Sequence, residues 1–146
     1  MEEIDRQILR LLSQDGRMSF TDLGRATGLS TSAVHQRVRR LEQRGVIRGY
    51  TVVVQSEALD LPLTAFVSVT PLDPAQPDDV PEQLSSVPEV EACYSVAGDE
   101  NYILKVRVAT PSALETLLAR IRGKANVSTR TTIVLSTSYE SRPLPI

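Results

Sequence analysis

Apolar residues recur at helical spacing in three short segments of the first fifty residues. The first segment places four of them on one helical face, at Ile4, Ile8, Leu11 and Leu12. The first helix ends at the turn signal of Gly16. A second helix starts after Ser19, where Ser-Phe-Thr-Asp has the form of a capping box, and it extends to about Thr27. Gly28 suits the positive φ of a helix end, and Ser30 can cap a third helix. The pattern predicts a helix-turn-helix with a three-residue turn.

The third helix, expected over about 31–44, has two chemically distinct faces. Val34, Val38 and Leu41 form its apolar stripe, and the opposite face carries Ser, Gln and Arg side chains. Such side chains pair with base edges and phosphates, and the helix has four arginines against one acid, Glu42. A solvated helix face remains the alternative interpretation. We expect DNA contacts from Ser30, Thr31, Ser32, His35, Gln36, Arg37, Arg39 and Arg40.

The rest of the chain has alternating strand patterns separated by two helical ones. A β-branched run over 51–54 predicts a connecting strand. The segments that follow are a strand over 64–70, a helix over 80–87, strands over 90–96 and 102–108, a helix over 114–121 and a strand over 130–139. The order βαββαβ is the ferredoxin-like pattern, an antiparallel sheet with helices on one face. The chain is therefore predicted to be α+β, with a winged-type helix-turn-helix of three helices before a ferredoxin-like domain.

The uncovered face of this sheet is predicted to meet a partner. The strand over 64–70 has apolar or hydroxyl side chains on both sides, with Phe66, Ser68 and Thr70 opposite Ala65, Val67 and Val69. A face left in water normally carries charge at alternate positions. We therefore expect a second sheet to pack on this face, so that the chain forms a homo-oligomer. The interface would add buried apolar surface to a domain whose core has few aromatic residues.

Charge separates the chain into the same parts. Residues 1–50 hold nine arginines and six acids, whereas the remainder holds seven basic and twelve acidic residues. This asymmetry favours double-stranded DNA as the partner of the first part only. We expect a DNA-binding domain over 1–50, a connecting strand or linker over 51–62, and an effector-binding and oligomerisation domain over 63–146.

Several classes of protein are excluded by composition. One cysteine and one histidine, far apart in sequence, provide neither a metal site nor a nucleophile–base pair, so no cofactor, metal or enzymatic activity is expected. No apolar run reaches the roughly 18 residues of a membrane helix, and the acidic N-terminus does not look like a signal peptide. We expect a cytoplasmic, nucleoid-associated protein that does not bind membranes.

Several segments resemble the Lrp/AsnC, or feast/famine, regulators along nearly the whole chain. They are Ile4-Asp5 with Asp15-Gly16-Arg17, Leu29-Ser30-Thr31-Ser32-Ala33-Val34, Arg37-Val38-Arg39-Arg40-Leu41-Glu42, Gly45-Val46-Ile47, and Val96-Ala97-Gly98-Asp99-Glu100-Asn101-Tyr102-Ile103-Leu104-Lys105-Val106. The resemblance implies dimers formed through the C-terminal sheets and an amino-acid effector bound between neighbouring dimers. Of the possible oligomers, we expect an octamer first and a dimer or tetramer next.

The hairpin segment is where the resemblance implies the effector. Gly98, Asp99 and Tyr102 match the family motif, while Asn101 stands where the family commonly has Asp. A glycine turn permits close backbone approach, and a carboxylate can receive an ammonium group, which is the part we expect Asp99 to play. The expected effector residues are Gly98, Asp99, Glu100, Asn101, Tyr102, Thr132 and Ser136.

One other function shares the same DNA-binding half. An architectural, nucleoid-type DNA-binding protein without effector control would have the same helix-turn-helix. It would differ only in whether a ligand changes DNA binding, so the sequence predicts an effector-responsive transcriptional regulator and leaves this alternative open.

Overall fold

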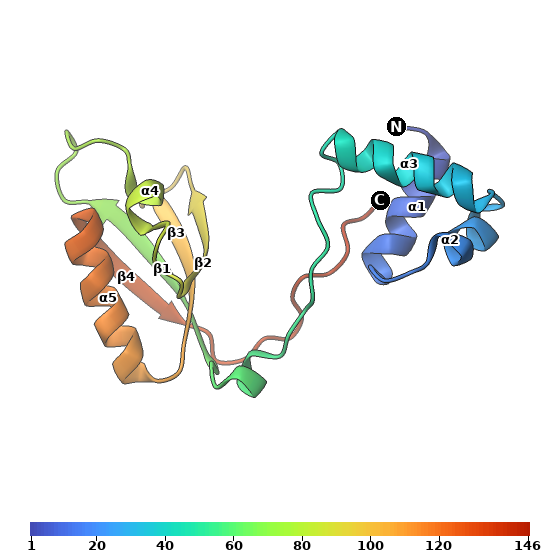
Figure 1. Cartoon of the computed structure of the whole chain (residues 1–146). Helices are drawn as coiled ribbons and strands as arrows, with labels where there is room; N and C mark the ends of the chain where they lie inside the picture. Colours follow the sequence, from blue (N-terminus) through green and yellow to red (C-terminus); the bar gives the residue numbers. More distant parts are fainter. The chain divides into compact units, whose positions relative to one another are not determined.

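The structure, a computed structural model, describes residues 1–146 and divides them into two compact units (Figure 1). The first unit comprises Met1–Val53 together with Tyr139–Ile146, and the second comprises Val54–Ser138. Each unit has its own cluster of buried apolar side chains. No helix is both long enough and apolar enough to cross a membrane.

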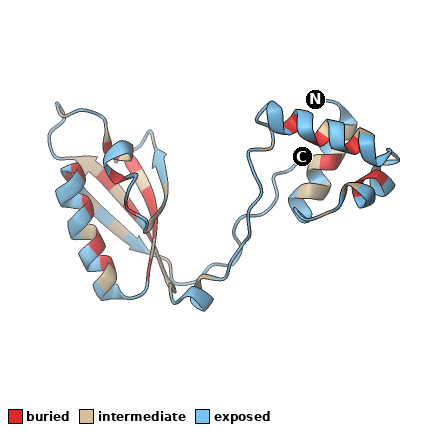
Figure 2. Ribbon diagram, in the orientation of Figure 1, coloured by how far each residue is buried: buried red, intermediate tan, exposed pale blue.

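The first unit contains the three predicted helices. They are α1 (Glu3–Gln14), α2 (Phe20–Thr27) and α3 (Thr31–Gln43). One residue of α1, one of α2 and two of α3 form the buried cluster: Ile8, Leu23, Val34 and Val38. Figure 2 shows these buried positions on the faces where the helices meet. The predicted helical faces are therefore confirmed.

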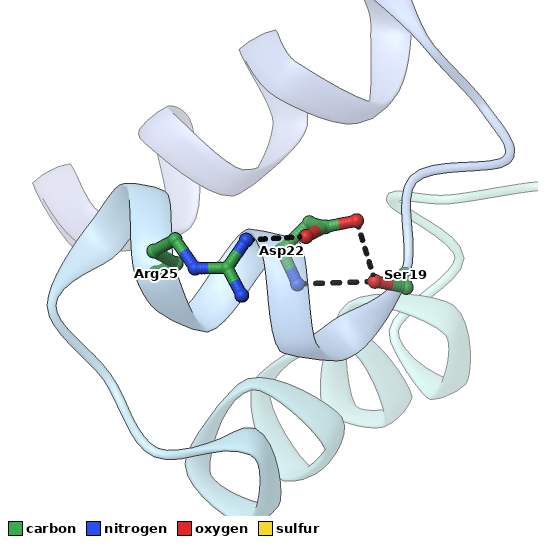
Figure 3. Close-up of polar contacts among 3 residues, drawn as sticks. All are labelled: Ser19, Asp22 and Arg25. Carbon is green, nitrogen blue, oxygen red and sulfur yellow. Dashed lines mark hydrogen bonds and ion pairs between the residues drawn. The ribbon is translucent and has the colours of Figure 1, made fainter.

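Side-chain caps begin both helices of the helix-turn-helix. The Ser19 hydroxyl accepts a hydrogen bond from the Asp22 backbone N–H (3.0 Å) and donates one to Asp22 Oδ2 (2.8 Å), while Arg25 donates to Asp22 Oδ1 (3.0 Å; Figure 3). Ser30 likewise caps α3, because its hydroxyl accepts from the backbone N–H of Ala33 (3.2 Å). These caps satisfy backbone donors that the first helical turn leaves unpaired.

The turn between α2 and α3 depends on two glycines. Gly28 follows α2 with φ of 73°, a left-handed conformation that glycine adopts without strain. Gly24, inside α2, lies so close to the turn that an added Cβ would stand 2.6 Å from the Leu29 carbonyl oxygen. The small residue allows the turn backbone to approach the helix, so the turn and the helix fold as one motif.

The second unit is a four-stranded antiparallel sheet with two helices. Its strands are β1 (Leu63–Pro71), β2 (Val90–Ser95), β3 (Tyr102–Val108) and β4 (Val127–Ile133), and its helices are α4 (Val80–Leu84) and α5 (Pro111–Ala125). The strand order is β2-β3-β1-β4. This order, with the connections β1-α4-β2 and β3-α5-β4, is the predicted ferredoxin-like α+β arrangement.

The two faces of the sheet differ in burial. Ala65, Val67 and Val69 of β1 are fully buried together with side chains of α4 and α5. Alternate residues of the same strand point to the other face, where Phe66 is 38% exposed. The helices thus cover one face only, as predicted, and the second face of the sheet is open.

Two predicted strands are wrong in extent. Residues 51–54 form no strand; a short 3-10 helix, Ser56–Leu59, precedes β1 instead. The last strand covers Val127–Ile133 rather than 130–139 and ends with one further bond, from Val134 N–H to the Thr64 carbonyl. β-Branched residues fit a strand, but a strand also requires a hydrogen-bonded neighbour, which residues 51–54 and 135–139 lack. The predicted helix over 80–87 is also shorter and ends at Leu84.

Candidate DNA-binding and ligand-binding sites

The outer face of α3 presents polar side chains to solvent. The exposed residues of its first three turns are Thr31, Ser32, His35, Gln36, Arg39 and Arg40. No carboxylate lies within ion-pair distance of Arg39 or Arg40, so both guanidinium groups are available to phosphates or bases. Ser30 contributes its hydroxyl to the helix N-terminus and lies 3.2 Å from the Ser32 hydroxyl.

Arg37 differs from its neighbours on α3. Its guanidinium donates to Asp5 Oδ1 and to Glu2 Oε2, both at 2.8 Å, and the residue is half-buried. The hydrogen bonds to Glu2 and to Asp5 raise the pKa of Arg37 above its usual value. Asp5, on α1, is only 7% exposed. Arg37 therefore joins α3 to the start of α1, a role that the sequence pattern did not suggest.

His35 also has a partner inside the unit. Its ring packs edge-on against Phe20 at the start of α2, with ring centroids 5.2 Å apart. The histidine is otherwise exposed. The contact fixes the ring at the junction of the two helices, where a DNA groove or phosphate contact is geometrically possible.

The hairpin between β2 and β3 borders a cleft in the second unit. The cleft has a volume of about 190 Å³ and is lined by Asp78, Ser95, Val96, Ala97, Gly98, Glu100, Asn101 and Tyr102. The structure therefore brings together four of the predicted effector residues, namely Gly98, Glu100, Asn101 and Tyr102. The lining has two carboxylates and no Lys, Arg or His, so the cleft favours a cationic group.

Gly98 leaves this cleft open. A Cβ added there would meet only Glu100 Oε2, at 4.0 Å, and the residue has no left-handed φ. The turn itself therefore does not require glycine. The backbone of the hairpin is fixed nearby by Val96 N–H donating to the Asn101 carbonyl (3.0 Å) and Asn101 N–H donating to the Val69 carbonyl (3.1 Å).

A second cleft lies beside the hairpin. It has a volume of about 210 Å³ and is lined by Ser68, Thr70, Asp99, Glu100, Ser128, Thr129 and Arg130. Glu100 lines both clefts; Ser68 donates to its Oε1 at 3.1 Å, and Arg130 lies 3.8 Å from its Oε2. Asp99 lines only this second cleft, together with the cationic Arg130. The predicted ammonium acceptor is thus separated from the cleft that contains Gly98 and Tyr102.

Asp78 is a lining residue that the sequence analysis did not propose for the effector. The Tyr102 hydroxyl donates to Asp78 Oδ1 at 2.5 Å, and this bond raises the pKa of Tyr102 to about 12. Asp78 lies in the loop between β1 and α4, which is rich in Pro and Asp, a composition typical of a solvated loop. Asp78 is far from the hairpin in the sequence but close to it in the folded chain. Only the fold therefore identifies it as a candidate site residue.

Two predicted effector residues lie away from the hairpin. Thr132 pairs with Phe66 on the open face of the sheet, and Ser136 lies beyond the end of β4. The strand predicted over 130–139 would have contained both, but β4 ends at Ile133, so Ser136 lies outside it. Neither residue lines the two clefts described above.

The open face of the sheet combines apolar and paired charged side chains. Phe66 and Tyr94 are large and exposed on this face. Next to them, Glu91 at an irregularity of β2 forms ion pairs with Lys105 (3.4 Å) and Arg107 (3.1 Å). Each of these charged side chains therefore already has an ion-pair partner on the face, which lowers the cost of covering it.

These features define a helix-turn-helix protein with a separate ligand-binding domain. Residues 1–42 match the AsnC-type helix-turn-helix domain, and residues 64–144 match the Lrp/AsnC ligand binding domain. The chain belongs to the Lrp/AsnC family, as its sequence indicated, and is an effector-responsive, DNA-binding transcriptional regulator. The family is one of regulators, not of enzymes.

Similar proteins cover almost the full chain. The HTH-type transcriptional regulator LrpA of Mycobacterium tuberculosis is 55% identical over 97% of this chain and 95% of its own. The leucine-responsive regulatory protein of Escherichia coli is 39% identical over 100% of this chain and 92% of its own. Among solved structures, a feast or famine regulatory protein from M. tuberculosis in complex with L-methionine is 55% identical, with a TM-score of 0.95 over 97% of this chain and 96% of that one.

Proposed function

We propose that the exposed face of α3 binds operator DNA, and that a free amino acid bound at the hairpin changes this binding. The observation that carries the DNA contact is the pair Arg39 and Arg40, which are exposed and have no carboxylate partner on a capped helix. Ser30, Thr31, Ser32, His35 and Gln36 complete the proposed surface. A regulator of this kind acts where the DNA is, so we place it in the cytoplasm with the nucleoid.

The DNA contact is tested by fluorescence anisotropy with operator and unrelated duplexes at several salt concentrations. Arg39→Ala is expected to cost about 1–3 kcal/mol on the operator and to relax base preference, since a bidentate arginine reads guanine. Arg40→Ala should weaken all duplexes and lower the salt slope by about 1. Binding like wild type in both variants would show that α3 is not the recognition helix.

The amino-acid effector is supported by the chemistry of the cleft and by a relative. The cleft beside Gly98 is lined by carboxylates without a cationic residue, and a relative 55% identical to this chain binds L-methionine. A ligand changes DNA affinity only through unequal binding to two states, and couplings of about 1–3 kcal/mol correspond to changes of roughly 5- to 150-fold.

Calorimetry against the common amino acids, with and without operator DNA, tests this second part. Gly98→Leu should abolish binding, because the larger side chain would occupy the cleft. The fold should survive, since the space at residue 98 is open and the residue has no left-handed φ. The coupling must be reciprocal, so DNA should change the effector affinity by the same factor. An intact DNA contact with no amino-acid binding to wild type would instead favour an architectural protein.

We further propose that two copies pack through the open face of the sheet and that dimers assemble further, an octamer first. The face offers Phe66 and Tyr94 beside charges that are already paired. Light scattering of the full chain should give an even-numbered oligomer, and Phe66→Asp should reduce it to smaller species. Operators should then be pseudo-palindromic, with half-sites a whole number of helical turns apart. A monomeric wild type would contradict this assembly.

A further inference from the structure

The two carboxylates that line the cleft beside Gly98 differ in their partners. Glu100 is only 16% exposed at its side chain; it accepts from Ser68 and faces Arg130, so a cation already lies near its charge. Asp78 accepts from the Tyr102 hydroxyl, which is a neutral donor, and no ion pair involves it. Asp78 is therefore the carboxylate of the cleft whose negative charge is not compensated.

Tyr102 fixes the position of that charge. Its ring is buried within the core of the second unit, 5% exposed, and its hydroxyl reaches out of the core to Asp78 Oδ1. The loop over 72–79 has no strand or helix of its own, so this bond joins it to β3. The bond uses one oxygen of the carboxylate, and Oδ2 remains available to a ligand.

We propose that Asp78, and not Asp99, receives the α-ammonium group of the amino-acid effector, and that Tyr102 is the positioning residue that holds Asp78 at the cleft. This inference rests on the proposed effector function and adds which residue recognises the charged end of the ligand. An ammonium donor meets an acceptor-only carboxylate there, and a hydrogen bond between two charged groups is of the strong, charge-assisted kind. Asp99 lines only the other cleft and does not border the one that contains Gly98, Asp78 and Tyr102.

The experiment is isothermal titration of the full chain with L-methionine, L-leucine and L-lysine, each paired with the same acid lacking its α-ammonium group. Asp78→Asn should weaken binding of the amino acid about tenfold to a hundredfold, the range of a lost charge-assisted bond. It should leave the affinity for the deaminated acid unchanged. The amide oxygen introduced by this substitution can still accept from the Tyr102 hydroxyl, so the loop keeps its attachment.

Three further variants separate recognition from general damage. Tyr102→Phe keeps the buried ring and should reduce only the preference for the amino acid over the deaminated acid, by less than Asp78→Asn does. The double variant should lose no more than Asp78→Asn alone, because both changes act on one contact. Asp73→Asn removes the same charge from the same loop outside the cleft and should bind like wild type.

The possible results distinguish this inference from the proposed function. Wild type that binds neither these three nor any other of the common amino acids would overturn both. Wild type that binds, with Asp78→Asn unchanged, would overturn the inference and leave the effector function standing. Equal losses for an amino acid and its deaminated acid would also overturn it, because Asp78 would then act on the shape of the cleft and not on the ammonium group.

Discussion

The buried cluster of the helix-turn-helix unit has four side chains, whereas that of the sheet unit has fifteen. The small unit supplements its core with polar contacts: the caps at Ser19 and Ser30, and the ion pairs that join Arg37 to the start of α1. The sheet unit relies on antiparallel pairing and on the apolar face of α5. Each side chain of the smaller core therefore carries a larger share of its unit's stability.

This contrast also explains how each unit presents its site. The proposed DNA-binding face lies on one helix whose two sides follow directly from the sequence pattern. The proposed ligand cleft is formed by a loop and a hairpin that are joined through Tyr102 and Asp78. The following changes, from the largest expected effect to the smallest, test how separate the two units are.

Removing one core side chain from each unit should give the largest effect. Leu23→Ala and Leu117→Ala both truncate fully buried side chains, and each should cost about 2–5 kcal/mol. Leu23→Ala should abolish DNA binding while effector binding survives, because its cluster is confined to the first unit. Thermal unfolding followed by circular dichroism, together with anisotropy and calorimetry, measures this. A single transition lowered equally by both variants would show that the units are not independent.

Replacing two helical glycines by alanine should change the free energy of unfolding in opposite directions. Gly24→Ala places a Cβ 2.6 Å from the Leu29 carbonyl oxygen and should destabilise the first unit by about 1–3 kcal/mol, as overpacking does. Gly123, within α5, has no atom within 4 Å of the corresponding position, so Gly123→Ala should stabilise the second unit by about 0.5–1 kcal/mol. Urea unfolding measures both. Stabilisation by Gly24→Ala would mean that the turn can relax.

The ion pairs of Arg37 should affect DNA binding differently from an arginine that contacts phosphate. Asp5→Asn removes a negative charge, which by electrostatics alone should strengthen DNA binding. We expect it instead to weaken operator binding about tenfold, since α3 loses a charge-assisted attachment to α1. Arg37→Ala should act in the same direction. Salt titrations should show unchanged slopes for both; a slope lowered by about 1 in Arg37→Ala would assign it to a phosphate.

The helix caps should give the smallest effects. Ser30→Ala and Thr110→Ala each remove a hydroxyl that accepts from the backbone three residues later, and each should cost about 1 kcal/mol. Ser30→Ala should also lower operator affinity, because the capped end belongs to the proposed DNA surface, whereas Thr110→Ala should leave it unchanged. Urea unfolding and anisotropy provide the comparison, and equal DNA effects would refute it.

The sequence by itself determined the elements whose signals are local. Helical spacing and the residues Ser19, Gly28 and Ser30 gave the helix-turn-helix to within a residue or two at its ends, because capping and periodicity act over one or two turns. Alternation gave the element order βαββαβ, and the hairpin residues Gly98, Glu100, Asn101 and Tyr102 were placed together because they adjoin in the chain.

The tertiary structure decided whatever depends on contacts between distant residues. Residues 51–54 and 135–139 have strand-forming side chains but no hydrogen-bonded neighbour, so neither forms a strand. Arg37 is an arginine on the predicted recognition helix and was therefore expected to contact DNA. It instead donates hydrogen bonds to Asp5 and Glu2, more than thirty positions earlier. Asp78 lies at the cleft because its carboxylate accepts a hydrogen bond from Tyr102, which is 24 positions later in the sequence. Pairing across such distances depends on how the backbone folds, and no local periodicity records it.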